Sequence, residues 1–441
     1  MTTTVAPAVR PDVDRPAAMR AWQLAAIEFL PCFLVSLLLV GFIIEDGTLW
    51  PWDPAMVDLD VYRAAVVDLL AGRSVYDTVA TTHYLKFIYP PIAAILFVPL
   101  ALIPVWLMRV VWIAATTWAI VVVLRRCRAP RGVVLGLVAV LVAIAVEPLR
   151  TTLGYGQVNT LLMVLVVVDL LPGLRALVAG ESGQSEAPAG PRPWRWQGVL
   201  IGVAAAIKLT PLLFVVLLAC AGRWAAALRA VAVFAGLTLL GWIIMPGSTA
   251  RFVDDLRHGE FNTGSVAYVG NQSWDGVITR LHTDEDQWLL LGLVIGVVVA
   301  GIATIAAAWL WRSGDPITAV GLTGLATCLA SPLSWTHHHV WAIVLLLGLL
   351  TEASWWPRLI RWAGIAWVGW IALCLPLAIL PYGGGVEWTY TRGQSIVANA
   401  GPVFGSVVIL LIAGLVVRLA VPAALAWARE RSLRRRPSHA W

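Results

Sequence analysis

Charged residues are scarce in this sequence. Only 13% of its 441 residues are charged and 60% are hydrophobic, with a mean hydropathy of +0.82. A soluble protein carries about 25% charged residues and roughly half apolar ones, so this composition excludes an ordinary soluble fold. Repeated apolar runs of about 18 or more residues match the length of a helix that crosses a bilayer. The sequence therefore predicts an all-α polytopic membrane protein.

Cysteine is scarce as well, and its spacing excludes two kinds of site. The five cysteines are scattered in or beside apolar runs, without the spacing of a metal site or a disulfide framework. The isoelectric point near 9.3 does not indicate a nucleic-acid partner. The basic residues are mostly arginines in short clusters beside apolar runs, which is typical of cytoplasmic loops under the positive-inside rule.

The charge pattern places the first loop outside the cytoplasm. Arginines precede the first apolar run, whereas Glu45 and Asp46 follow it, and this asymmetry predicts a cytoplasmic N-terminus. The predicted organisation is a disordered cytoplasmic tail at 1–23, one transmembrane domain at 24–420 and a basic cytoplasmic tail at 421–441. Within that domain we expect outer loops at 45–90 and 246–287 and, from its Gly/Pro/Ser/Glu content, a cytoplasmic linker at 172–197.

Two interruptions decide the rest of the topology. Ile103-Pro104 predicts a short dipping segment before a full span, and Lys208 with Pro211 splits the run 198–221 into two short helices. Both choices keep the arginine clusters and the C-terminus inside, and they bring every polar motif to the outer face. The resulting spans, about twelve in all, are 24–44, 105–124, 133–147, 158–171, two arms within 198–221, 224–245, 288–311, 316–330, 338–352, 362–380 and 402–420.

Asp58 is the candidate general base. The segment from Asp58 to Leu70 has helical apolar spacing and predicts a short amphipathic helix at the membrane surface. Asp60 lies about 200° away from Asp58 on a helix and is spaced to pair with Arg63, whereas Asp58 shares its face with Tyr62. Asp58 is therefore either the N-cap of a surface helix or a base whose pKa is raised by partial burial.

Several cationic or hydrogen-bonding side chains are candidates for binding a phosphate. Lys208 lies at a helix break within an apolar run, where an ammonium is costly unless it functions, although it could instead snorkel to the interface. Arg150 and Arg280 are predicted on the same face and suit a phosphate clamp. His337 and His338 either contact phosphate or only pack at the interface. Three consecutive histidines cannot ligate one metal from a regular helix, and no metal is expected.

A third group of polar and aromatic residues suits sugar recognition. Amides offer hydrogen bonds and aromatic rings offer apolar faces, although each residue taken singly is more often a loop stabiliser. The predicted sugar-binding and acceptor-binding residues are Asp60, Tyr62, Arg63, Tyr155, Gln157, Asn159, Asn271, Gln272, Trp274 and Trp335.

The motifs are specific in combination. They are Tyr89-Pro90-Pro91, Glu147-Pro148-Leu149-Arg150, Tyr155-Gly156-Gln157-Val158-Asn159, Lys208-Leu209-Thr210-Pro211, Asn271-Gln272-Ser273-Trp274 and Ser331-Pro332 with Ser334-Trp335-Thr336-His337-His338. Together they resemble glycosyltransferase family 87, polyprenol-phosphate-mannose-dependent α-1,2-mannosyltransferases of the GT-C architecture. The resemblance extends from the first outer loop to about Trp341. His339 stands where this family leads us to expect an aromatic residue.

The resemblance implies a function. It implies a catalytic aspartate at the position of Asp58, a lipid-phosphate mannose donor and inversion at the anomeric carbon. The implied acceptor is a phosphatidylinositol mannoside, converted from tetramannoside to pentamannoside at the periplasmic face of the plasma membrane, without a cofactor. Alternatives are α-1,2 branching of lipomannan or lipoarabinomannan, and transfer of arabinofuranose from its polyprenyl phosphate.

Two alternatives belong to other classes of protein. A lipid or solute transporter tends to place charged groups near the membrane midplane between repeats, but no repeat is evident here and the polar residues gather at one face. A membrane acyltransferase would use a histidine of the run 337–339, which would leave Asp58 and Lys208 unexplained.

Overall fold

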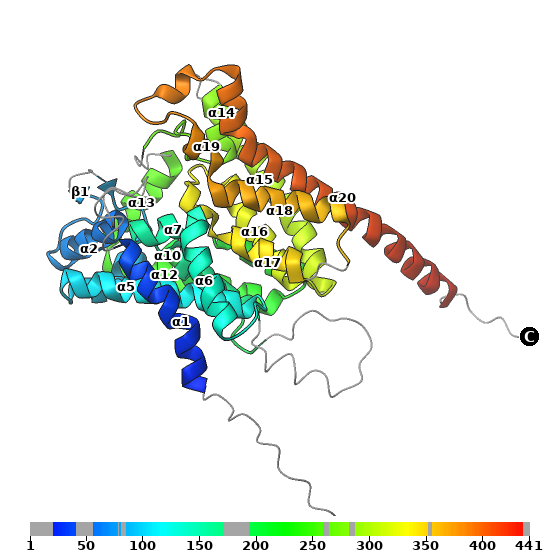
Figure 1. The fold of residues 1–441 in the computed structure, drawn as a ribbon, viewed down its shortest axis with the longest axis horizontal. Coiled ribbons are helices and arrows are strands. Elements are labelled where there is room, and N and C mark those ends of the chain that lie inside the picture. The colour runs from blue at the N-terminus through cyan, green and yellow to red at the C-terminus, as the bar shows by residue number, and fades with distance from the viewer. Residues whose placement is uncertain are drawn as a thin grey trace, which may run out of the picture.

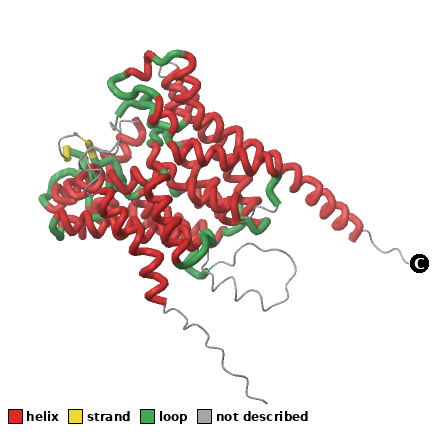
Figure 2. Tube along the Cα trace, viewed as in Figure 1, coloured by secondary structure: helices red, strands yellow, loops and turns green. Residues whose placement is uncertain are grey.

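The computed structural model describes residues 21–40, 56–77, 79–80, 85–171, 194–258, 264–281, 287–351 and 355–434. Helices make up most of this structure (Figures 1 and 2). The strands described are β1 (Val79–Ala80) and β2 (Leu85–Lys86), an antiparallel pair of two residues each. The predicted all-α fold class is confirmed. Most of the predicted tail at 1–23, namely 1–20, and most of the predicted linker at 172–197, namely 172–193, lie outside the described residues.

The helices follow one another in an order close to the predicted one. In the first half they are α1 (Ala21–Leu38), α2 (Val57–Leu70), α3 (Pro91–Leu96), α4 (Val98–Ala101), α5 (Val105–Arg126), α6 (Val133–Ala145), α7 (Glu147–Tyr155), α8 (Asn159–Leu170), α10 (Val199–Ile207) and α11 (Leu212–Cys220). In the second half they are α12 (Trp224–Ile244), α13 (Pro246–His258), α14 (Trp274–Leu281), α15 (Gln287–Arg312), α16 (Pro316–Ala330), the 3₁₀ helix η2 (Thr336–Trp341), α17 (Ala342–Thr351), α18 (Arg358–Leu373), α19 (Leu375–Ile379), η3 (Val386–Thr389) and α20 (Arg392–Arg434).

The predicted count of twelve spans is not confirmed. Among the described residues, five helices are long and apolar enough to cross a membrane, or six if the bent pair α6 and α7 is one span. The other apolar helices, such as α8, α16 and α17, are shorter. At the C-terminus, α20 runs on to Arg434, beyond the predicted end of the span at residue 420, and the side chains after Pro422 lie outside the described set.

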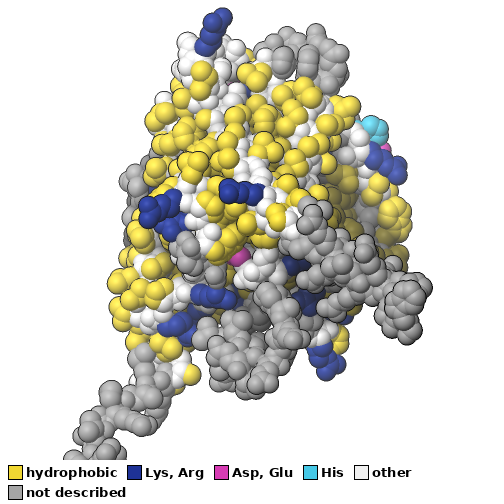
Figure 3. Space-filling view, turned by 90° about the vertical axis from the view of Figure 1, so that its right-hand side faces the viewer, with side chains coloured by type: hydrophobic (Ala, Val, Ile, Leu, Met, Phe, Trp, Pro, Cys, Tyr) yellow, Lys and Arg dark blue, Asp and Glu magenta, His cyan; other side chains and the backbone are white. Residues whose placement is uncertain are grey.

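Large hydrophobic side chains cover much of the helical surface. Leu239 and Ile243 of α12 and Val297 and Ile305 of α15 are all exposed. Figure 3 shows one face that is mostly hydrophobic, with separate arginine or lysine side chains within it and along its edges. A monomeric soluble protein rarely exposes a continuous apolar patch of this kind, so these helices present their outer faces to lipid.

The helix bundle has two chemically different ends. At one end, Arg126 Nη1 donates to the carbonyl of Leu171, just after α8, at 2.7 Å. Arg312 at the end of α15 donates to the carbonyl of Cys220 at 2.7 Å. We call this the arginine end. The opposite end holds the first residue of α8, Asn159, which contacts Lys208, and we call it the site end.

The interruption at Lys208 is a helix break, as predicted. α10 ends at Ile207, Lys208 has an extended backbone with φ −149° and ψ 133°, and α11 begins at Leu212. Pro211 lacks an N–H and so cannot continue the hydrogen bonding of a preceding helix. α10 starts at the arginine end, where the Asp169 carboxylate accepts from the Gly198 N–H at 2.9 Å. The hairpin therefore starts with α10 and finishes with α11 at the arginine end, and Lys208 lies at its tip.

The segment after α6 differs from its prediction. The predicted spans 133–147 and 158–171 leave residues 148–150 in the turn between them, whereas these residues belong to the first turn of α7, which bends 78° away from α6. Val146 at the bend is extended, and Pro148 occupies a position in the first turn of α7 where a missing N–H costs little. The bend lays α7 across the site end, where most of its residues are buried.

Candidate active site

A cavity of about 740 Å³ opens at the site end. Its walls come from α2, the segment 85–90, α7, the break between α10 and α11, α13, the segment 331–338 and the segment 383–387. Half of the predicted site residues line it: Asp58, Tyr62, Tyr155, Gln157, Lys208, Trp335, His337 and His338. These residues are up to 280 positions apart in sequence, from Asp58 to His338, so helix packing brings them together.

Close contact with the end of α7 fixes the first turn of α2. The Met56 N–H donates to the carbonyl of Gly154 at 2.6 Å. Gly156 has φ 67°, and a Cβ there would lie 2.7 Å from Leu59 Cβ, so only glycine allows this approach. The N-cap of α2 is Met56 rather than Asp58, and the capping alternative for Asp58 is therefore wrong.

Asp58 lies half-buried in the cavity wall. Burial raises the pKa of its carboxyl to about 6, although a hydrogen bond from the Gln157 side chain and the positive charge of Lys208 oppose this shift. Burial disfavours the charged form of a carboxyl, whereas donors and cations favour it. A carboxylate with a pKa near neutrality can both accept a proton and release it.

Lys208 is held by side chains from three parts of the chain. Its Nζ donates to Asn159 Oδ1 at 2.9 Å and lies 3.2 Å from His338 Nε2 and 5.7 Å from the centre of the Tyr89 ring. Asn159 does not line the cavity, but its Nδ2 donates to the carbonyl of His337 at 3.0 Å. Asn159 therefore acts as a bridge between the lysine and η2.

The three histidines have different surroundings. Burial and the nearby Lys208 lower the pKa of His337 to about 3, so this ring is neutral near pH 7 and can only donate or accept as an imidazole. His338 contacts Lys208 as described. His339 lies apart from the cavity with its Nδ1 3.2 Å from the carbonyl of Trp335.

An acidic and aromatic region forms another part of the cavity wall. The Glu147 carboxylate accepts from the Thr151 hydroxyl at 2.8 Å and from the Thr336 hydroxyl at 2.9 Å. Tyr268 packs edge-on against Trp335, with 5.7 Å between ring centres. All five side chains line the cavity. This wall offers acceptors and ring faces without a fixed cation among these five.

Asp60 was predicted to pair with Arg63, and the positive charge of Arg63 does act on the Asp60 carboxyl, but the ion pair of this carboxylate is with another arginine. Asp60 Oδ2 instead accepts from Arg109 Nη2 of α5 at 3.3 Å. Neither Asp60 nor Arg63 lines the cavity. Arg109, in the next long helix, therefore takes the hydrogen bond that the local i,i+3 spacing predicted for Arg63.

The predicted arginine clamp is not assembled at the cavity. Arg150 donates to the carbonyl of Ile144 at 3.3 Å and does not line the cavity. Arg280 donates from Nε to Asn399 Oδ1 at 2.8 Å and from Nη1 to the carbonyl of Asn271 at 3.0 Å. Arg280 thereby ties α14 to α20 and to the segment before α14.

The Asn271–Trp274 motif also lies behind the cavity wall. Asn271 Oδ1 accepts from the Ser334 N–H at 2.9 Å, and Gln272 Nε2 donates to the carbonyl of Val269 at 2.7 Å. Trp274 Nε1 donates to the Ser406 hydroxyl at 3.0 Å. None of the three motif side chains lines the cavity, and the Asn271 contact braces the segment that carries Trp335.

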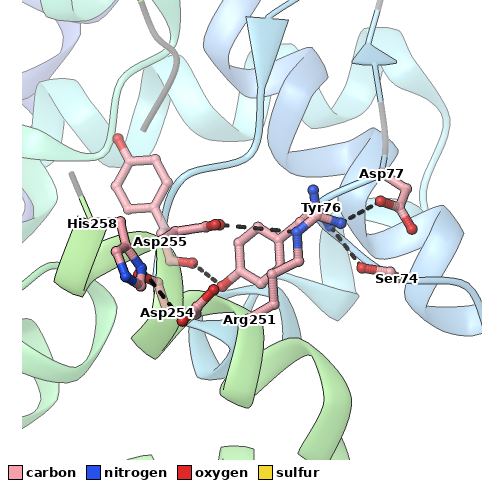
Figure 4. A network of polar contacts seen from close by, with 8 residues as sticks. Ser74, Tyr76, Asp77, Arg251, Asp254, Asp255 and His258 are labelled. Atoms are coloured by element: carbon pink, nitrogen blue, oxygen red, sulfur yellow. Dashed lines mark hydrogen bonds and ion pairs between the residues drawn. The ribbon is translucent and has the colours of Figure 1, made fainter. Parts of the chain in front are cut away.

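A polar network joins α13 to the segment after α2 at the edge of the cavity (Figure 4). Arg251 forms ion pairs with Asp77 and, at 3.9 Å, with Asp255, and its guanidinium lies 6.0 Å from the centre of the Tyr76 ring. Phe252 on the same helix lines the cavity. The network therefore fixes one wall of the cavity against the loop that follows α2.

Several lining residues were not predicted as site residues. Tyr89 and Glu147 belong to motifs that the sequence displays, but their hydroxyl and carboxylate contacts depend on distant segments. Lys86, the only other lysine of the chain, also lines the cavity. Tyr268 had no sequence signal, because nothing local distinguishes it from other loop aromatics.

A helical membrane body with a carboxylate and an ammonium in one large cavity is a membrane protein with a site for a polar or charged ligand. The sequence pattern of glycosyltransferase family 87 matches residues 87–332, more than half of the chain. The chain therefore belongs to glycosyltransferase family 87, and the resemblance inferred from its motifs is confirmed. Asp58 lies before the matched residues, and His337 and His338 lie after them.

Curated relatives cover nearly the whole chain. The chain is 31% identical to a "Polyprenol-phosphate-mannose-dependent alpha-(1-2)-phosphatidylinositol pentamannoside mannosyltransferase" of Mycobacterium tuberculosis (strain CDC 1551 / Oshkosh), over 96% of this chain and 92% of the relative. It is 30% identical to a protein of the same name from Mycolicibacterium smegmatis, over 93% and 92%. A third relative, from M. tuberculosis H37Rv, is called a "phosphatidylinositol mannoside mannosyltransferase" and is 28% identical over 90% and 95%.

Proposed function

We propose that this enzyme transfers mannose from polyprenyl-phosphate-mannose to a phosphatidylinositol mannoside, forming an α-1,2 bond with inversion of the anomeric carbon. One observation carries the proposal: Asp58 and Lys208 line the same cavity, although they come from segments 150 residues apart. The names of the curated relatives support this donor and this class of acceptor. We further propose the step from tetramannoside to pentamannoside.

Asp58 acts as the general base in this proposal. The 2-hydroxyl oxygen of the acceptor mannose attacks the anomeric carbon of the donor, and its proton passes to the Asp58 carboxylate. As the new C–O bond forms, the bond from the anomeric carbon to the phosphate oxygen breaks. The polyprenyl monophosphate leaves with that electron pair, and the proton on Asp58 is later released to solvent. The pKa of about 6 suits both proton transfers.

Lys208 stabilises the leaving phosphate. Asn159 and His338 hold its ammonium at the cavity wall, so the charge is in place before the reaction begins. A fixed cation in a poorly hydrated site stabilises developing negative charge better than a mobile one in water. The reaction therefore proceeds without a metal or another cofactor in this proposal, and a chelator is expected to leave the rate unchanged.

The other wall of the cavity receives the acceptor glycan. Glu147 supplies carboxylate acceptors for sugar hydroxyls, and Tyr155, Tyr268 and Trp335 supply ring faces and polar tips. Carbohydrates combine such hydroxyls with weakly apolar C–H faces, and aromatic side chains with a polar tip suit that mixture. The donor phosphate then lies at the Lys208 side and the acceptor at the Glu147 side, with Asp58 within reach of the junction.

The bundle orientation supports a site on the periplasmic face of the plasma membrane. Arg125, Arg126, Arg131 and Arg312 gather at the end opposite the cavity, as the positive-inside rule expects of a cytoplasmic face. We propose about twelve membrane passages with the short helices included, both termini in the cytoplasm, and the lipid tails of both substrates in the surrounding bilayer.

The test is a transfer assay with purified full-length protein. Polyprenyl-phosphate-mannose is supplied with phosphatidylinositol dimannoside, tetramannoside or pentamannoside, and the products are analysed by mass and linkage. We expect one α-1,2-linked mannose to be added to the tetramannoside. Transfer only to lipomannan, or transfer only from polyprenyl-phosphate-arabinose, would replace the proposed acceptor or donor. Lipid flux across proteoliposomes without any transfer would replace the enzyme by a transporter.

A further inference from the structure

Gln157 sits between Asp58 and two buried tyrosines. The Gln157 Oε1 atom lies 3.1 Å from the Tyr62 hydroxyl and 3.0 Å from the Tyr89 hydroxyl, and the two hydroxyls lie 2.9 Å from each other. Tyr62 is 1% exposed and Tyr89 is 5% exposed. On the other side, the Asp58 carboxylate accepts a hydrogen bond from the Gln157 side chain.

Gln157 Oε1 faces the two tyrosine hydroxyls, so the hydroxyls are the donors in this triangle. Each tyrosine has one O–H, and the Gln157 carbonyl oxygen has none. If one hydroxyl donates to the other, the second still donates to Oε1, and otherwise both donate to Oε1. In each arrangement within the triangle, Oε1 accepts at least one hydrogen bond. Burial raises the pKa of both tyrosines, so neither loses its proton near neutral pH.

Fixing Oε1 toward the tyrosines turns Nε2 toward Asp58. An ionised carboxylate only accepts hydrogen bonds, and Nε2 is the only donor of a glutamine side chain. The contact between Gln157 and Asp58 therefore requires the amide orientation in which the two tyrosines donate to Oε1. The carboxylate selects this orientation, because a flipped amide would place its carbonyl against the carboxylate, and the tyrosine hydroxyls then hold Oε1 by donating to it.

The backbone around Gln157 fixes the distance as well as the orientation. The Gln157 N–H donates to the carbonyl of Thr152 at 2.9 Å, which closes the turn after α7. The preceding Gly156 lets Leu59 approach the turn, as described above. Asp58 is the neighbour of Leu59, so the same contact sets how far the carboxylate lies from the amide.

We propose that Gln157 is a positioning residue for the Asp58 base, with its amide locked by the hydroxyls of Tyr62 and Tyr89. The inference rests on the proposed function, because it assigns Asp58 the role of proton acceptor. It changes the role that the sequence predicted for Gln157 and Tyr62, from contacting sugar to orienting the base. The amide hydrogen bond holds one face of the carboxylate and favours its ionised form at neutral pH.

The first experiment compares pH profiles of kcat/KM for the glycolipid acceptor. Gln157→Met removes the donor at nearly constant length, so we expect the acidic limb to move upward by about one to two pH units, the worth of a hydrogen bond to a charged group. Gln157→Glu places a second acid beside Asp58, and we expect the limb to move upward as well. We expect kcat to fall more than KM rises in both variants.

The tyrosines provide a sharper test. Tyr62→Phe and Tyr89→Phe each leave one hydroxyl to bind Oε1, so each single variant should shift the limb only slightly. The double variant removes both donors and releases the amide, and its loss of kcat should exceed the product of the two single losses. The matched control is Tyr76→Phe, which removes a buried hydroxyl that donates to the carbonyl of Tyr89 at 2.7 Å without touching the amide. Its acidic limb should not move.

A second readout separates this inference from the proposed function. Infrared difference spectra of the purified protein follow the carboxyl band that is lost in Asp58→Asn, and they report its titration without substrates. We expect the midpoint of that band to rise in Gln157→Met. An unchanged midpoint in a folded Gln157→Met protein would overturn the positioning role even if the wild type transfers mannose. A shifted midpoint in a protein that transfers no sugar would overturn the proposed function alone.

Discussion

Each end of the bundle holds an acidic side chain near basic ones, but the two acids differ in how many donors contact them. At the arginine end, Glu28 of α1 is fully buried, and its carboxylate accepts from Arg125, from Arg131 Nε at 2.7 Å and from the Gly132 N–H at 2.9 Å. At the site end, Asp58 is half-buried, accepts from one amide and shares a large cavity with Lys208. The first acid is saturated with donors, whereas the second keeps capacity for a proton.

The number of hydrogen-bond donors around each carboxylate distinguishes a structural acid from a reactive one. A buried charge is tolerated when paired and hydrogen-bonded, and Glu28 joins α1 to α5 and to the segment before α6 in this way. Asp58 has an environment that raises its pKa and a space beside it for a substrate. Residue type alone would not distinguish the two.

The largest effect is expected for Asp58→Asn. The amide keeps the size of the side chain but cannot accept the proton, and removing a general base typically costs about 10²–10⁴-fold in rate. The measurement is kcat for mannose transfer by purified protein. The matched control is Asp60→Asn, two residues along α2, which faces Arg109 and not the cavity and should retain most activity. Equal losses in the two variants would contradict the assignment.

The next effect is expected for Lys208→Met. Removing a fixed charge that stabilises a leaving group costs about 10²–10³-fold in kcat. Single-turnover kinetics with labelled donor separate this step from binding. A Lys208→Met protein that changes only its affinity for the acceptor would contradict the role of Lys208 in stabilising the leaving phosphate.

Glu28→Gln should affect stability and not chemistry. Its arginine partners are 28% and 46% exposed, so the expected loss is about 1–3 kcal/mol, below the cost of breaking a fully buried pair. Thermal unfolding in detergent measures the loss, and kcat per folded molecule should stay within about twofold of the wild type. A large drop in kcat at unchanged stability would show that Glu28 takes part in the chemistry and is not only a structural acid.

Arg280→Lys should have the smallest effect on turnover. The guanidinium contacts protein acceptors on α20 and before α14, which a lysine cannot reproduce, so stability should fall by about 1–2 kcal/mol. The KM for the donor should change less than about threefold, a factor that corresponds to under 1 kcal/mol. A KM increase as large as that of a Lys208 variant would restore Arg280 as a phosphate ligand.

Patterns confined to one segment were predictable from the sequence. The helix at Val57–Leu70, the break at Lys208 and the start of a long helix at Val105 all follow from apolar spacing, proline positions and charge asymmetry. The same charge rule placed the motifs at one end of the bundle. These features depend on how each segment interacts with water and lipid, and those interactions follow the same rules in every membrane protein.

Contacts between distant segments were not predictable in the same way. The pairing of Asp60 depends on Arg109, 49 residues away, and the amide of Gln157 depends on Tyr62 and Tyr89. Asn271 was predicted to bind sugar through its amide, but its Oδ1 accepts a hydrogen bond from the Ser334 N–H. Side-chain type shows what a residue can bind, whereas the partner that reaches it is decided by tertiary packing.

The pH dependence of kcat/KM for mannose transfer, in the wild type and in Lys208→Met, tests the central claim most directly. Asp58 must be ionised to accept a proton, so wild-type activity should fall as the pH decreases through about 6. The ammonium of Lys208 favours the carboxylate, and its loss should raise the pKa of Asp58 and move this limb to higher pH. An acidic limb at the same pH in both proteins would show that the two residues do not share one site.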